Sequence, residues 1–237
     1  MPFHIKKKLL SMNKKGFIFD LDGVIVDTAK YHYLAWKSLA KSVGINFTHQ
    51  QNEQLKGISR ENSLKKIIEW GNIKLSNDEF LKLMSKKNEE YLSYISNMND
   101  SEILPDVTKM LNYLSQHNRP IALGSASKNS KQILKKVNLL NQFNAIVDGN
   151  DVTEAKPNPE VFLKAASKIN VPAENCVVFE DAVAGIQAAN AANMISIGIG
   201  EASVLNEADF VFKDFTEISS EFIEKISKIK KKELKKV

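Results

Sequence analysis

From Pro105 onward the sequence alternates short apolar segments with longer segments of helical periodicity, and this alternation limits the choice of fold. Short apolar runs that end at glycine or polar residues are typical of buried strands, whereas apolar residues three or four positions apart are typical of helices. We expect helices over 106–116, 130–137, 159–168 and 182–192, and strands over 120–124, 145–147, 176–179 and 195–199. The pattern predicts an α/β fold with a Rossmann-like parallel sheet and helices on both faces.

A further strand is expected much earlier, where the apolar run Phe17-Ile18-Phe19 stops at Asp20-Leu21-Asp22-Gly23. Side chains alternate faces along a strand, so Asp20 and Asp22 are expected to project the same way. Two neighbouring carboxylates repel each other unless a cation binds between them or one keeps a proton. The alternative is an ordinary acidic turn, since Asp-Gly is a common turn signal.

Between this strand and Pro105 the sequence carries helical signals and no convincing strand. Helical periodicity covers 36–43, where Gly44 ends the run, and then 63–70, 78–84 and 86–95. We therefore predict a core domain made of residues 1–29 and 98–237, with an inserted all-α cap domain over residues 30–97 that lies above the strand ends.

The strand ends of the predicted sheet carry polar residues, and ligands bind at this edge of open parallel sheets. Ser125 to Asn129 follow one strand and supply donors for an anion, although an ordinary helix cap is the simpler explanation of those residues alone. Lys156 precedes Pro157 and could present a point charge, and Glu180-Asp181 follow the strand over 176–179. Together with Asp20 and Asp22, these carboxylates predict an oxygen cage suited to Mg²⁺.

Composition excludes several other classes of protein. The chain has 237 residues and a formal net charge of +5, with many of its lysines near the two ends. No aromatic residues interleave with those lysines, so we expect a solvated, lysine-rich final helix and no nucleic-acid partner. No apolar run approaches the ~20 residues that cross a membrane, and Cys176 is the only cysteine. We expect a cytoplasmic protein without a membrane partner.

The joint order of these motifs resembles the haloacid dehalogenase superfamily, whose members are mostly Mg-dependent phosphotransferases. The four matching motifs are Asp20-Leu21-Asp22-Gly23, Ser125, Lys156 and Glu180-Asp181. Longer matches resemble the β-phosphoglucomutases within that superfamily, and they cover residues 27–32, 52–61, 125–129 and 185–188. The resemblance covers nearly the whole chain from Lys15 onward, and the helical insertion stands where the superfamily carries its cap.

The resemblance implies roles for the residues at the strand ends. Asp20 would be the nucleophile that becomes an aspartyl phosphate, and Asp22 would be the general acid and base. Mg²⁺ would be held by Asp20, the backbone carbonyl of Asp22, Glu180 and Asp181. The remaining core residues would contact the substrate, the first three of them at its transferring phosphoryl group: Ser125, Lys156, Ala126, Ser127 and Asn129.

The resemblance also implies roles for residues of the helical insertion. Arg60 would grip the non-transferring phosphate with its planar guanidinium, and Lys56 and Gly57 would line the sugar site beside Trp36. Thr28, just before the insertion, and His32 and Lys87 within it would couple closure of the cap to the position of Asp22. Without the resemblance, His32 would be an ordinary histidine on a helix surface.

The implied reaction converts β-D-glucose 1-phosphate to β-D-glucose 6-phosphate through the 1,6-bisphosphate, with small sugar phosphates as partners and a monomeric enzyme. The nearest alternative is a sugar-phosphate phosphatase, which uses the same phosphoenzyme with water as acceptor. A non-catalytic phosphate- or metal-binding module is the alternative from another class. Residues 1–13 precede the family-like start and are expected to contribute nothing to catalysis, and Asn193 stands where many relatives have glycine.

Overall fold

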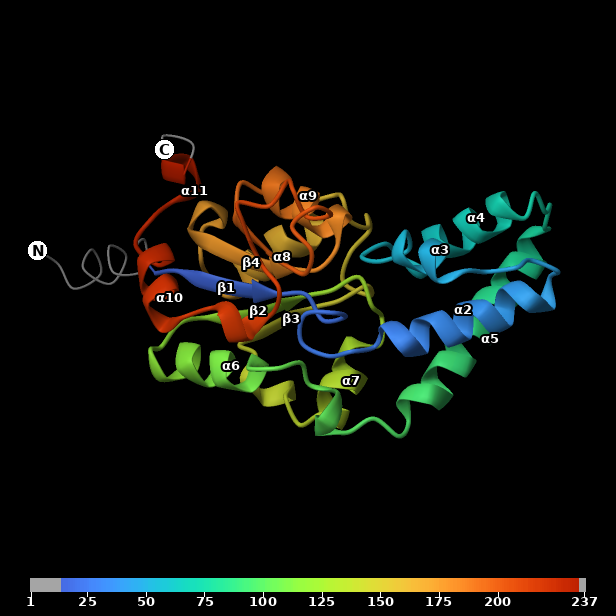
Figure 1. Cartoon of the computed structure of the whole chain (residues 1–237), viewed down its shortest axis with the longest axis horizontal. Coiled ribbons are helices and arrows are strands. Elements are labelled where there is room, and N and C mark those ends of the chain that lie inside the picture. Colours follow the sequence, from blue (N-terminus) through green and yellow to red (C-terminus); the bar gives the residue numbers. More distant parts are fainter. Residues whose placement is uncertain (1–13, 235–237) are drawn as a thin grey trace, which may run out of the picture.

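The computed structural model describes residues 14–234, so the expectation for residues 1–13 lies outside the described part of the chain. A sheet with helices on both faces forms one part of the molecule, and a block of four helices lies beyond the carboxyl ends of the strands (Figure 1). None of the helices in the described residues is both long enough and apolar enough to span a membrane.

The sheet has six parallel strands in the order β3-β2-β1-β4-β5-β6. The strands are β1 (Gly16–Phe19), β2 (Ile121–Gly124), β3 (Ala145–Val147), β4 (Cys176–Glu180), β5 (Ile195–Ile199) and β6 (Phe210–Phe212). Phe19 at the end of β1 pairs with Leu123 of β2 and with Phe179 of β4. The carboxyl ends of these three adjacent strands therefore lie side by side in the middle of the sheet, as predicted.

The two faces of β1 are buried by different sets of helices. Phe17 and Phe19 face a core that includes α6 and α10, whereas Ile18 faces a core built by α8 and α9. The helices around the sheet are α6 (Val107–Gln116), α7 (Ser130–Lys136), α8 (Glu160–Lys168), α9 (Val183–Ala191), α10 (Ser220–Ile226) and α11 (Lys231–Leu234). Short 3-10 helices are η1 (Asp100–Glu102), η2 (Leu140–Gln142), η3 (Ala173–Asn175) and η4 (Phe215–Glu217). The predicted Rossmann-like α/β arrangement is thus confirmed.

The helical block contains α2 (Ala29–Ser42), α3 (His49–Glu53), α4 (Arg60–Trp70) and α5 (Asn77–Ile95). It has a core of its own, in which Trp36 and Leu39 of α2 pack with Leu64 and Ile67 of α4. The block occupies the position predicted for the cap, and the domain boundaries near residues 30 and 97 stay a prediction.

Several elements differ from the sequence-based expectation. The expectation of separate helices over 78–84 and 86–95 was wrong, because α5 is one continuous helix. It starts at a capping box formed by Ser76 and Glu79. The segment between the two expected helices contains no glycine or proline that would break a helix. The short elements α3 and β6 were not expected, and the lysine-rich end forms α10 and α11 in place of one helix.

Candidate active site

Asp20 is the first residue after β1, and the end of the sheet holds it in place. Its backbone N–H donates to the carbonyl of Phe179 on β4 at 3.0 Å. Its buried carboxylate accepts hydrogen bonds from Lys156 Nζ at 2.5 Å and from the backbone N–H of Asp22 at 3.0 Å. This geometry fixes the carboxylate and leaves it at the surface of a cavity.

Lys156 stands between two carboxylates. Its ammonium group donates to Asp20 at 2.5 Å and to Glu180 at 2.7 Å, and the residue is only 2% exposed. Burial lowers the pKa of Lys156, but the two carboxylates outweigh it and raise the pKa above its usual value. A lysine before a turn is usually exposed, so only the tertiary structure shows that this one is buried.

Asp22 faces a different set of partners from Asp20. Its carboxylate accepts a hydrogen bond from the hydroxyl of Thr28 and lies 3.7 Å from Nε2 of His32. Burial raises the pKa of Asp22, but His32 and Thr28 favour the ionised form and hold the pKa below its ordinary value. Asp20 and Asp22 both line the cavity, but their carboxylates have different partners: Lys156 for Asp20, and Thr28 and His32 for Asp22.

Lys87 of α5 supports His32 from the other side. Its Nζ lies 3.0 Å from Nδ1 of His32 and 4.6 Å from the ring centres of both Trp36 and Tyr91. Burial and the charge of Arg60 lower the pKa of Lys87 to about 7, and burial together with Lys87 lowers the pKa of His32. Tyr91, which is four residues beyond Lys87 on the same helix, packs against His32 with ring centres 4.3 Å apart and ring planes inclined by 36°.

Ser125 and its neighbours shape the end of β2. The hydroxyl oxygen of Ser125 accepts the backbone N–H of Ser127 at 3.1 Å, and that of Ser127 accepts the N–H of Asn129 at 3.2 Å. Because each serine oxygen accepts from the backbone, its own O–H proton is left to donate to an anion. The side chain of Asn129 forms no helix cap; it donates to Asn88 of α5 at 3.0 Å. The two serine side chains thus accept backbone N–H groups just ahead of α7 and also line the cavity.

The carboxylates at this edge outnumber the cations beside them. Burial raises the pKa of Asp20 to about 7 despite Lys156, and burial with the charges of Glu180 and Asp20 raises the pKa of Asp181 well above its usual range. Lys56 of the helical block reaches within 3.9 Å of Asp181. A donor set of carboxylate oxygens with excess negative charge fits a hard divalent cation such as Mg²⁺.

The four carboxylates nevertheless do not gather around one point. Over residues 14–234, no three His, Cys, Asp or Glu side chains converge in the manner of a metal centre. Glu180 is fully buried and directs its carboxylate to Lys156 and to the backbone N–H of Ala182 at 2.7 Å. Of these four carboxylates, the three that line the cavity are those of Asp20, Asp22 and Asp181.

A cavity of about 500 Å³ lies between the sheet edge and the helical block. Thr28 and Glu180 are the two predicted site residues that do not line it, and they lie behind Asp22 and Lys156. The other predicted residues all line the cavity: Asp20, Asp22, His32, Trp36, Lys56, Gly57, Arg60, Lys87, Ser125, Ala126, Ser127, Asn129, Lys156 and Asp181.

Two parts of the cavity wall were missed by sequence reasoning. Ser59 caps α4 by accepting the N–H of Asn62 at 3.2 Å, and it leaves the positive end of that helix beside Arg60. The loop over 152–155 forms another wall, where Glu160 accepts hydrogen bonds from Thr153. A serine three residues before Asn62 was available as a cap signal, whereas nothing in the loop sequence indicated a wall.

The arrangement combines two kinds of carboxylate chemistry. Asp20 is held by a cation and open to the cavity, which suits attack on an electrophile such as phosphorus. Asp22 is connected to His32 and Lys87, which suits movement of a proton. The cavity is lined by a cationic group from the core, Lys156, and by one from the helical block, Arg60, which suits a ligand with two anionic groups.

Comparison with known proteins agrees with this geometry. The family model of the haloacid dehalogenase-like hydrolases matches residues 17–199. The chain is 40% identical over 211 residues to β-phosphoglucomutase of Bacillus subtilis, a match that covers 88% of this chain and 93% of the relative. It is 34% identical over 187 residues to fructose-1-phosphate phosphatase of Escherichia coli, with 78% and 95% covered.

The structure is also similar to solved structures. The crystal structure of β-phosphoglucomutase from Clostridium difficile matches with a TM-score of 0.87 and 42% sequence identity, over 90% of this chain and 97% of that chain. The chain belongs to the haloacid dehalogenase-like hydrolase family and is a homologue of β-phosphoglucomutase, an isomerase.

Proposed function

We propose that this protein is a β-phosphoglucomutase, which converts β-D-glucose 1-phosphate to β-D-glucose 6-phosphate through β-glucose 1,6-bisphosphate. The observation that carries the proposal is the shared cavity: the aspartates of the sheet edge and Lys56, Gly57 and Arg60 of the helical block line the same 500 Å³ space. Lys156 of the core and Arg60 of the helical block then offer one cationic group to each of the two phosphates of the bisphosphate. The similarity to the β-phosphoglucomutase of Bacillus subtilis supports the same assignment.

Asp20 is the nucleophile in this proposal. Its carboxylate oxygen attacks the phosphorus at position 1 of the bisphosphate, the bond from phosphorus to the sugar oxygen breaks, and an aspartyl phosphate forms while glucose 6-phosphate leaves. The 6-hydroxyl of the next β-glucose 1-phosphate then attacks the aspartyl phosphate, which restores the bisphosphate and frees Asp20. Lys156 holds the Asp20 carboxylate at 2.5 Å and neutralises charge on the transferring group. Ser125 donates its O–H proton to that group, and Ala126 contributes a backbone contact.

Asp22 is the general acid and base. It gives a proton to the sugar oxygen that leaves phosphorus, and it takes the proton of the hydroxyl that attacks the aspartyl phosphate. Thr28 and His32 hold its carboxylate, and Lys87 holds His32 at 3.0 Å. Because His32 and Lys87 belong to the helical block, closure of that block sets the position of Asp22.

Mg²⁺ is the proposed cofactor, with Asp20, Asp181 and the backbone carbonyl of Asp22 as ligands and Glu180 behind them. When bound, the ion supplies positive charge that offsets the negative charge of the transferring phosphoryl group. The excess of carboxylates over cations at this edge supports the proposal.

The helical block, residues 30–97, is proposed as the cap, and it binds the sugar and the distal phosphate. Arg60 stands at the first position of α4, where its guanidinium and the helix end both attract an anion. Trp36, Ser127 and Asn129 line the space for the sugar. A closed cap excludes water, so the aspartyl phosphate passes to the sugar. The enzyme is proposed to work as a monomer in the cytoplasm, in line with its single buried cysteine.

One assay tests the proposal. The purified protein receives β-glucose 1-phosphate, Mg²⁺ and a trace of β-glucose 1,6-bisphosphate, and glucose 6-phosphate is measured against free phosphate. A mutase forms glucose 6-phosphate in large excess over free phosphate. Release of free phosphate alone would replace the proposal with a sugar-phosphate phosphatase, the activity named for the less similar Escherichia coli relative.

Arg60→Ala tests the contribution of the cap. Loss of a charge-assisted contact to the distal phosphate is expected to cost on the order of 3 kcal/mol in kcat/KM and to raise the share of turnovers that end in free phosphate. Lys66→Ala is the matched control, because Lys66 is an exposed cation on the same helix outside the cavity. An unchanged product ratio and rate in Arg60→Ala would show that the cap segment is structural.

A further inference from the structure

The two chain segments that connect the sheet to the helical block run side by side. Leu104 donates its N–H to the carbonyl of Ile25 at 3.0 Å, and Asp27 donates its N–H to the carbonyl of Glu102 at 2.9 Å. Val26 and Ile103 form an isolated antiparallel bridge between these bonds. The connection between the helical block and the sheet is therefore a short ladder of backbone hydrogen bonds.

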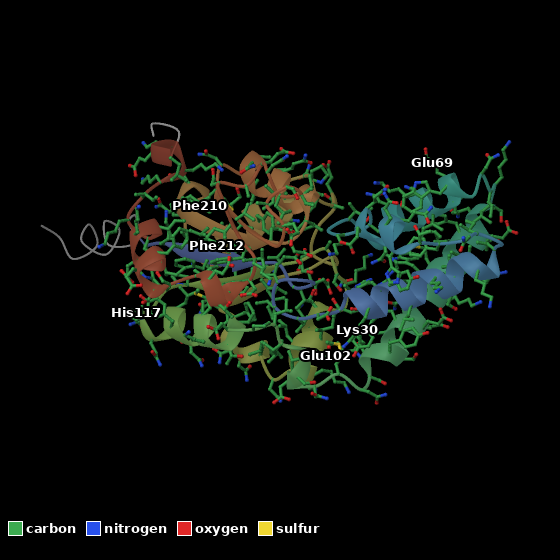
Figure 2. The ribbon with its side chains drawn as sticks, viewed as in Figure 1. Lys30, Glu69, Glu102, His117, Phe210 and Phe212 are labelled. Atoms are coloured by element: carbon green, nitrogen blue, oxygen red, sulfur yellow. The ribbon has the colours of Figure 1, made fainter. Side chains whose placement is uncertain are left out.

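Glu102 fastens this ladder to the start of α2. Its Oε1 accepts from Lys30 Nζ at 2.9 Å and from the hydroxyl of Tyr31 at 2.6 Å, and its Oε2 accepts from Lys30 Nζ at 2.7 Å. The Glu102 side chain is 14% exposed, although Lys30 is 49% exposed. Figure 2 shows Lys30 and Glu102 next to each other where the helical block joins the rest of the molecule.

Lys30 and Tyr31 are neighbours of the residues that hold Asp22. The backbone N–H groups of Tyr31 and His32 both donate to the carbonyl of Thr28, at 3.0 and 3.1 Å. Thr28 and His32 in turn contact the carboxylate of Asp22. A shift of the first turn of α2 thus moves both partners of Asp22 together.

We propose that Glu102 is a positioning residue for Asp22: by clasping Lys30 and Tyr31 it fixes the pivot about which the helical block closes. The inference rests on the proposed mutase function. It concerns a group that lies outside the cavity and that touches neither the sugar phosphate nor the reacting carboxylates.

Three variants of the clasp and one matched control test this inference. Glu102→Ala removes the whole clasp, Glu102→Gln keeps an acceptor without the charge, and Tyr31→Phe removes a single hydroxyl. Glu224→Ala is the control, because Glu224 of α10 accepts in the same way from Tyr113 at 3.0 Å and from Arg119 at 3.5 Å, but on the part of the core remote from the helical block.

The measurements are kcat, KM, the ratio of free phosphate to glucose 6-phosphate, and the radius of gyration of the unliganded protein by small-angle X-ray scattering. We expect Glu102→Ala to lower kcat roughly tenfold with a smaller change in KM, to raise the phosphate ratio and to enlarge the radius of gyration. Glu102→Gln and Tyr31→Phe should change the same quantities in the same direction by less. Glu224→Ala should keep the wild-type values of all four.

Two results would overturn the inference: wild-type kcat and phosphate ratio in Glu102→Ala, or the same losses in Glu224→Ala as in Glu102→Ala. A failure of the mutase proposal is distinguishable, because the wild-type protein would then release only free phosphate. In that case kcat for phosphate release and the radius of gyration of the same four variants decide the inference.

Discussion

Asp20 and Asp22 are two residues apart and have identical side chains, yet their pKa values are shifted in opposite directions. Burial and neighbouring carboxylates raise the pKa of Asp20 to about 7, while His32 and Thr28 overcome burial and hold the pKa of Asp22 below its ordinary value. Pairs of titratable groups whose environments separate their pKa values are typical of acid–base sites. In the mutase proposal Asp20 must be ionised to attack phosphorus, so it needs further positive charge.

Asp20→Asn is expected to abolish phosphoenzyme formation and to lower turnover by roughly a thousandfold or more, because an amide oxygen cannot replace the carboxylate nucleophile. Intact-protein mass spectrometry after incubation with the bisphosphate measures the first effect, and the coupled assay measures the second. The matched control is Asp78→Asn on the exposed start of α5. Near-normal turnover in a folded Asp20→Asn protein would disprove the nucleophile assignment.

Removal of divalent cations tests the charge balance at the same residues. Exhaustive chelation is expected to abolish turnover, and Mg²⁺ should restore it. Because the clustered carboxylates repel one another, bound Mg²⁺ should also raise the melting temperature of the wild-type protein. In Asp181→Asn this rise should be smaller, so differential scanning calorimetry checks the metal site without an activity measurement. Full activity in a protein shown by elemental analysis to lack divalent metal would contradict the proposal.

The loop between α3 and α4 shows how one element of the helical block contacts the core. Gly57 has φ of +72°, and a Cβ at this position would lie 2.7 Å from the Cβ of Ala182, at the start of α9. A glycine is therefore needed twice, for its backbone conformation and for its close approach to the core. The contact lies beside Lys56 and Asp181, which line the cavity.

Gly57→Ala is expected to push this loop away from α9, lower kcat/KM and raise the share of free phosphate. The matched control is Gly44→Ala, because Gly44 has a similar φ of +79° but nothing within 4 Å of the added methyl group. Both variants should lose about 1 kcal/mol of stability from the strained backbone. Only Gly57→Ala should change the product ratio, and an equal change in both variants would assign the effect to backbone strain.

At the scale of the whole molecule, two lysines join the C-terminal segment to the sheet. Lys15, just before β1, donates to the carbonyl of Ile229, and burial lowers the pKa of Lys15 to about 8. Lys231 of α11 is 6% exposed and donates to Asn190 Oδ1 at 2.7 Å and to the carboxylate of Asp209. Asp209 also accepts the backbone N–H of Ser196 on β5 at 2.8 Å. Lys231 is therefore a structural side chain, whereas its neighbour Lys232 is exposed.

Lys231→Met is expected to lower the free energy of unfolding by roughly 2 kcal/mol, because the Asp209 carboxylate loses its cation. Methionine is similar to lysine in volume, so the packing at this position is kept. Lys232→Met is the matched control, since Lys232 is exposed on the same short helix. Urea unfolding measures both, and turnover at 25 °C should stay at the wild-type value in each. Equal stability of the two variants would show that the buried network contributes nothing.

The sequence by itself determined the parallel sheet and the place of the site on it. Strand and helix periods are local properties, and the carboxyl ends of parallel strands necessarily meet at one edge. The residues that follow β1, β2 and β4 were therefore predictable as neighbours, and Asn193 was predictable as a left-handed helix end, which its φ of +57° confirms. The helical block was predictable as an insertion, because helical periodicity is a local property and no strand pattern appears between the first strand and Pro105.

Only the tertiary structure decided how the charged groups are paired. Lys156 is separated from Asp20 by 136 positions, and Glu102 is separated from Tyr31 by 71, so no local period relates them. A buried carboxylate needs hydrogen-bond donors, and the fold decides which donors are near. Glu180 therefore accepts from Lys156, and Asp22 accepts from Thr28. Short elements such as β6 escaped prediction because three residues are too few to show a strand pattern. Pairing with β5 stabilises this strand.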